Sequence, residues 1–130
     1  MALAPLPRIN EITSAIIKAA IEVHRALGPG LLEAPYFACL VYELRNAGLR
    51  LDTERRVPVV YKEVRIDCGF RVDLIVEDTV VVEVKSLAQV APVHPAQLLT
   101  YLKFTGCPAG LLINFNVPVL KNGLTRVLNT

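Results

Sequence analysis

Residues 71–85, RVDLIVEDTVVVEVK, constrain the fold of this 130-residue chain more than any other stretch. Two apolar runs flank Glu77-Asp78-Thr79, and this pattern predicts a β-hairpin with strands at Gly69–Val76 and Val80–Lys85. Three charged residues nevertheless lie inside the hairpin: Asp73, Glu83 and Lys85. Because burying an unpaired charge is costly, these groups need partners, water or a metal ion.

The length of the hairpin loop decides whether the two acids meet. A three-residue loop places Val76 opposite Val80, and Asp73 then lies across from Glu83 on the same face, with Cβ atoms about 4.5–5.5 Å apart. A two-residue loop places Glu83 opposite Val72 instead, and the two acids then point to opposite faces of the sheet. A shared function for the acids requires the first register, or a bulge that restores it.

Two carboxylates that face each other repel unless a cation lies between them or one is protonated. Mg²⁺ prefers carboxylate, water and phosphate oxygens, so the first register would suit a magnesium ion. Lys85 lies on the same face as Glu83 and could hold a nucleophile or steady developing charge. The alternative is an ordinary solvated sheet face on which Glu83 and Lys85 guard a valine run against aggregation.

The rest of the chain predicts a single α/β domain with a mixed sheet flanked by helices. We expect an N-terminal extension over 1–9 and a domain over 10–130. Hydrophobic periodicity and turn residues predict helices at about 10–27, 32–47 and 94–105, and further strands at 56–61, 109–115 and 124–128, with a short one at 64–66. Pro58 favours an edge position for its strand. The helix between the third strand and the next predicts a crossover and a parallel pair.

Composition limits the classes of function. The net charge of +2 is too small to indicate nucleic-acid binding by itself. The 53% hydrophobic content favours an apolar surface for a second subunit, hence a homodimer. No apolar run is long enough for a membrane helix, and MALAPLPRIN does not suit a signal peptide, so we expect a cytoplasmic protein. The three cysteines form no metal or disulfide pattern.

Several motifs together resemble a known family. The pattern Asp73…Glu83-Val84-Lys85, in this order of elements, is similar to the PD-(D/E)XK nuclease superfamily. Gly30-Leu31-Leu32-Glu33-Ala34-Pro35-Tyr36 resembles the GxxExxY signature of one small family within it. The likeness extends through YELR (42–45), RVDL (71–74), VEVK (82–85), QLLTYLK (97–103) and LLINFNV (111–117). It implies a nuclease-like core of the order αβββαβ.

The resemblance also implies roles for individual residues. Asp73 and Glu83 match the metal-binding acids and Lys85 matches the catalytic lysine. Glu33 matches an acid presented to the metal from an early helix, and Gln97 matches a polar residue that supports the site. The implied activity is metal-dependent hydrolysis of phosphodiester bonds in DNA or RNA, with Mg²⁺ or Mn²⁺. The rival is a weakly active or inactive scaffold that binds a protein or nucleic-acid partner.

Three further residues are weaker candidates for substrate binding: Tyr36, His94 and Tyr101. Tyr36 lies on the helical face of Glu33, but a core aromatic with a satisfied hydroxyl is the simpler interpretation. His94 and Tyr101 share a polar stripe with Gln97, which faces either a substrate groove or water. His94 is followed by Pro95 where relatives often carry an acid, and a polar residue there also suits a helix start. Glu33 also has a simpler interpretation, since an acid in the first turn of a helix interacts favourably with the helix dipole.

Overall fold

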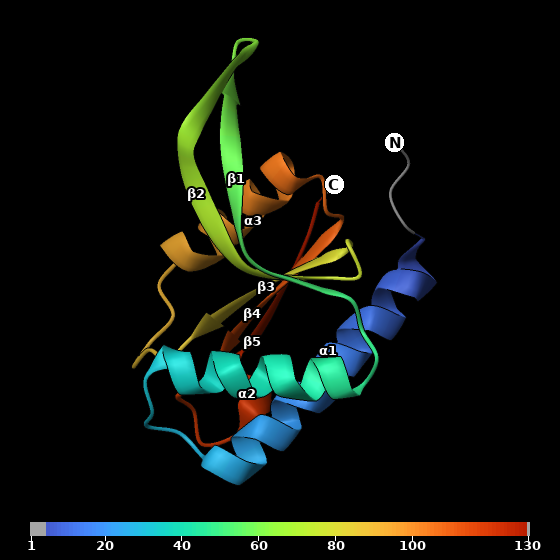
Figure 1. Cartoon of the computed structure of the whole chain (residues 1–130). Helices are drawn as coiled ribbons and strands as arrows, with labels where there is room; N and C mark the ends of the chain where they lie inside the picture. Colours follow the sequence, from blue (N-terminus) through green and yellow to red (C-terminus); the bar gives the residue numbers. More distant parts are fainter. Residues whose placement is uncertain (1–4, 130) are drawn as a thin grey trace.

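The computed structural model describes residues 5–129, with the side chain of Cys68 left aside. Three α-helices, one short 3₁₀ helix and five strands follow one another along the chain (Figure 1). Their bounds are α1 Leu6–Leu27, α2 Glu33–Asn46, β1 Leu51–Tyr61, β2 Val64–Val76, β3 Val80–Lys85, α3 Val93–Thr105, β4 Ala109–Asn114, η1 Leu120–Gly123 and β5 Leu124–Leu128. None of the helices in the described part is long and apolar enough to cross a membrane.

The strands form one mixed sheet in the order β1-β2-β3-β4-β5. The β3–β4 pair is parallel and the other pairs are antiparallel, so the predicted crossover through α3 is confirmed. The predicted edge position is confirmed too, because β1 lies at one end of the sheet. Pro58 lies at a register shift between Val57 and Val59, where the strand can do without its amide.

Helices cover both faces of the sheet. The α1 and α2 helices pack on one face, around a core that includes Ile16, Leu40 and Val82. The α3 helix packs on the other, around a smaller core that includes Ile75, Val81 and Leu98. These layers agree with the predicted α/β class.

The first helix begins earlier than the sequence predicted. It starts at Leu6 rather than Asn10, because Pro7 is tolerated in a first turn and buried Ile9 extends the apolar stripe. Asn10 does not cap the helix; its Oδ1 accepts a hydrogen bond from Arg126 at 2.8 Å. Residues 6–9 of the predicted extension are thus helical, and residues 1–4 lie outside the described residues.

The first two strands are longer than predicted and continue past the body of the protein. The predicted short strand at 64–66 is the start of β2, and β1 begins at Leu51 rather than Arg56. Figure 1 shows the far part of this hairpin, here called the arm, projecting away from the helices. Its turn consists of Lys62 and Glu63, both with positive φ.

Candidate active site

The strands β2 and β3 separate at the two predicted acids. Val76 pairs with Val80 and Leu74 with Val82, which confirms the three-residue loop and rules out the shorter one. At the next pair the carboxylates replace backbone partners. The amide of Asp73 donates to Oε1 of Glu83 at 3.1 Å, and the amide of Val84 donates to Oδ2 of Asp73 at 2.9 Å. The two acids therefore lie side by side where the ladder opens.

The carbonyl of Val84 faces the same opening. Backbone groups of successive strand residues point to alternate neighbouring strands. The carbonyl of Lys85 accepts from the amide of Phe115, beyond the end of β4, whereas the Val84 amide is directed to Asp73. The Val84 carbonyl oxygen consequently points towards β2, into the space where pairing has ended.

The pKa values show how closely the charges lie. Glu83 is only 6% exposed, and burial, followed by the negative charge of Asp73, raises its pKa to about 8. The charge of Lys85 acts in the opposite direction, so this ammonium lies near enough to stabilise the carboxylate. The pKa of Tyr101 is raised by burial and then by the charges of Glu83 and Asp73, so its hydroxyl lies within electrostatic range of the acids.

The place where β2 and β3 separate, at Asp73 and Glu83, is here called the fork. A cavity of about 260 Å³ lies next to it. The start of α2, strand β1 and the separated strands β2 and β3 line it, through Glu33, Ala34, Phe37, Glu54, Arg71, Asp73 and Val84. The structure thus brings Glu33 and Asp73 to one cavity. Glu54 and Arg71 were not predicted here. They form an ion pair at 3.2 Å, and an earlier predicted start for β1 would have placed Glu54 across from Asp73.

The donor set fits a magnesium-sized cation. Asp73 and Glu83 place two adjoining carboxylates at the fork, and the direction inferred for the Val84 carbonyl would add a third oxygen. Among the described residues no group of three or more His, Cys, Asp and Glu side chains is arranged to hold a metal ion, so Glu33 does not join the two strand acids in a closed cluster. Mg²⁺ commonly needs only one or two carboxylates, with water and substrate phosphate completing its shell.

The remaining predicted catalytic residues lie on the α3 side of the fork. Lys85 is half-buried on β3, and strand alternation directs its side chain to the face of Glu83. Gln97 is exposed on α3, one turn before Tyr101, so both lie on one helical face.

Tyr36 is buried in the core and does not line the cavity. Its side chain is fully buried and stacks on Phe115, with ring centroids 4.6 Å apart. Its hydroxyl donates to the Gly28 carbonyl at 2.5 Å and accepts from the Leu31 amide at 3.2 Å. The predicted contact of Tyr36 with a substrate does not fit this burial; its role is to close the turn that precedes Glu33.

His94 does not cap α3 but bonds to the chain just before the helix. Its Nδ1 accepts from the amide of Ala91 at 3.0 Å at the start of α3. Only Nε2 is left for a substrate, as a donor.

Two polar residues that the sequence did not single out for the site hold the loop after β3. The hydroxyl of Ser86 donates to the carbonyl of Leu31, which joins this loop to the segment before α2. The buried Asn114 accepts from the amide of Leu87 at 2.9 Å and donates to its carbonyl at 3.1 Å. These bonds fix the chain directly after Lys85.

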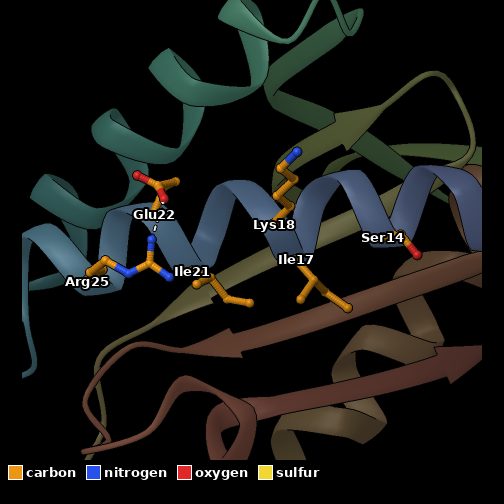
Figure 2. Close-up of a pocket in the computed structure, with 6 residues that line it drawn as sticks. All are labelled: Ser14, Ile17, Lys18, Ile21, Glu22 and Arg25. Atoms are coloured by element: carbon orange, nitrogen blue, oxygen red, sulfur yellow. Dashed lines mark hydrogen bonds and ion pairs between the residues drawn. The ribbon is translucent and has the colours of Figure 1, made fainter.

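A larger hollow, about 490 Å³, lies elsewhere, along α1. Figure 2 shows Ile17 and Ile21 on one side of the helix and Lys18 on the other, with Glu22 paired to Arg25 at 2.7 Å. It contains none of the predicted site residues.

Comparison with known proteins agrees with this geometry. No curated protein and no solved structure matches the chain. The family model described as PD-(D/E)XK nuclease superfamily matches residues 10–127, which include both helices before the sheet, the forked strands and α3. The chain belongs to the PD-(D/E)XK nuclease superfamily.

Proposed function

We propose that this protein is a metal-dependent nuclease that hydrolyses phosphodiester bonds of DNA or RNA. Superfamily membership suggests a nuclease-like function, and members generally depend on divalent metals. The observation that carries the proposal for this chain is the fork. Asp73 and Glu83 are brought together by bonds to each other's strands, in a place where burial and then the negative charge of Asp73 raise the pKa of Glu83 to about 8.

In this mechanism Asp73, Glu83 and the Val84 carbonyl would hold a Mg²⁺ or Mn²⁺ ion, and Glu33 would contribute from the other side of the cavity. When bound, the ion would supply Lewis-acid polarisation of the phosphoryl group. Lys85 holds the attacking water on the α3 side and stabilises charge as it develops. Gln97, exposed on the same side, orients that water or a substrate phosphate.

Two residues of the site suit substrate contact. Arg71 is held at the cavity by Glu54 and offers a guanidinium to a phosphate oxygen. Tyr101 is partly exposed within electrostatic range of the acids, and its ring can stack on a base. His94 remains a proposed substrate contact through Nε2.

The second candidate function is a scaffold with little or no activity that binds a protein or nucleic-acid partner. One observation favours it: the acids already satisfy backbone amides without any ion. Failure to bind Mg²⁺ or Mn²⁺ at millimolar concentration would support the scaffold.

The deciding experiment is incubation of the protein with single-stranded, duplex and branched DNA and with RNA, in Mn²⁺ or Mg²⁺. We expect cleavage that falls at least about 100-fold in Asp73→Asn and Lys85→Ala, because each removes a group that acts in the transition state. Cleavage that both variants retain would come from a contaminant and would leave the proposal without support.

Three further expectations are part of the proposal. These are a homodimer, a cytoplasmic location and membership of the GxxExxY family within the superfamily. Sedimentation at micromolar concentration tests the first, since a strictly monomeric protein would exclude it.

A further inference from the structure

A second cavity, of about 430 Å³, lies at the base of the arm, between β1, the start of β2 and the last turn of α3. Its lining consists of Arg55, Arg56, Val57, Pro58, Arg65, Phe104 and Thr105. Three of the nine arginines of the chain thus surround one hollow. No acid lines it, whereas the α1 hollow contains Glu22 and a third cavity contains Asp52 and Asp78.

The arginine side chains are available to a ligand. Arg55 pairs with Asp52 at 3.4 Å and Arg65 with Asp67 at 2.9 Å, but all four of these side chains are at least 47% exposed. Exposed ion pairs contribute little to stability because water and salt screen them, so an anion can displace these acids easily. Arginine binds phosphate through two parallel donors, which makes a phosphate oxygen the favoured occupant.

Aromatic contacts connect this cavity to the fork. Phe70 stacks on Tyr101 with centroids 4.5 Å apart and packs edge-on against Phe104 at 5.9 Å. Phe70 lies on β2, three residues before Asp73, and Phe104 lines the arginine cavity, about 5 Å further along α3 than Tyr101 at 1.5 Å per residue. The rings of Tyr101, Phe70 and Phe104 therefore lie between the arginine cavity and the part of β2 that leads to Asp73.

We propose that the arginine cavity binds a backbone phosphate of the nucleic-acid strand whose scissile bond lies at the fork, with bases stacked on the intervening aromatic rings. This inference rests on the proposed function. The cavity positions substrate but takes no part in the chemistry, so it acts on strands of several nucleotides and contributes little to a dinucleotide.

Equilibrium binding in EDTA tests the cavity separately from hydrolysis. The probes are fluorescein-labelled single-stranded DNA, duplex DNA and single-stranded RNA of roughly 12 nucleotides, followed by anisotropy over a series of salt concentrations. The test variant combines Arg55→Gln, Arg56→Gln and Arg65→Gln. The control combines Lys18→Gln, Arg25→Gln and Arg45→Gln, which removes the same charge from α1 and the far end of α2.

We expect the test variant to bind at least one probe 10-fold or more weakly than the wild type, with a salt slope smaller by about 0.7 for each lost contact to a single strand. The Kd of the control variant should stay within about threefold of the wild-type value, because only the general electrostatic attraction to nucleic acid is reduced. Equal losses in both triple variants, no loss in the test variant, or no binding of any probe by the wild type would overturn the inference.

The catalytic proposal fails separately. Binding that depends on the three arginines, together with no cleavage in Mn²⁺, would support the arginine cavity as a phosphate site and contradict the proposed nuclease activity. Cleavage by a test variant that binds the probes like the wild type would support the nuclease activity and contradict the role of the arginine cavity.

Discussion

Asp73 and Glu83 bond each other's strands through their side chains. The Asp73 amide donates a hydrogen bond to the Glu83 carboxylate. The Asp73 carboxylate accepts a hydrogen bond from the amide of Val84, the residue after Glu83. The two acids thus serve as rungs of the sheet as well as candidate ligands. Predictions about stability follow from this double role, and they can be tested without any substrate.

Replacing Asp73 with alanine should destabilise the protein by about 1–3 kcal/mol, because the Val84 amide loses its acceptor in a place with little water. Asp73→Asn should cost less than about 1 kcal/mol, since an amide oxygen can still accept that bond. Urea unfolding in EDTA measures both. Equal losses in the two variants would show that the charge, rather than the acceptor, stabilises the fork.

Without a bound cation, the stability of the protein should fall as pH rises from about 4.5 to 8. Folded Glu83 keeps its proton up to about pH 8, whereas its pKa in the unfolded chain is near 4.5. The folded state therefore binds more protons in this window, and each step up in pH favours unfolding. Glu83→Gln should flatten the profile, and denaturation at several pH values in EDTA checks this. Glu22→Gln, on the exposed side of α1, should leave the slope unchanged.

Magnesium should raise the melting temperature at pH 8. A ligand that binds only the folded state stabilises it by RT ln(1 + [L]/Kd), which reaches about 2.7 kcal/mol at 100 times Kd. Thermal scans with millimolar Mg²⁺, and with NaCl at matched ionic strength, measure the shift. Asp73→Asn should lose most of it. A shift of the same size with NaCl would indicate charge screening instead of a site.

Tyr36→Phe should destabilise the protein by about 1 kcal/mol, because its hydroxyl bonds to Gly28 and Leu31 would be lost while the ring stack on Phe115 remains. The matched control is Tyr42→Phe, whose side chain is 64% exposed and should change stability by less than about 0.5 kcal/mol. If both changes are equally mild, the turn before α2 does not depend on this hydroxyl.

Local sequence patterns predicted much of the fold. The alternation on both sides of Glu77-Asp78-Thr79 predicted β2 and β3 and limited their pairing to two registers, of which the structure has the one with the three-residue loop. Periodic apolar residues located all three helices, although α1 starts earlier than Asn10, which was expected to begin the helix because asparagine is a favoured cap residue. Proline in a first turn is compatible with a helix, and packing of Ile9 decides the outcome.

The arm and the arginine cavity could not be predicted in the same way. The start of β1 at Leu51 depends on pairing with Val76, a contact between residues far apart in the chain. The polar stretch from Asp52 to Arg56 has no alternation that would indicate a strand. The gathering of Arg55, Arg56 and Arg65 depends on that pairing and on a register shift at Pro58. Local patterns in one sequence indicate neither the pairing of distant strands nor a register shift.

The use of two acids as rungs has an evolutionary consequence. A descendant that had lost hydrolysis would still be selected to keep Asp73 and Glu83, because its sheet would weaken without them. Retention of these acids among relatives therefore records folding as much as chemistry. The side chain of Lys85 does not complete that ladder, so the lysine is the position at which abandonment of catalysis would first become visible.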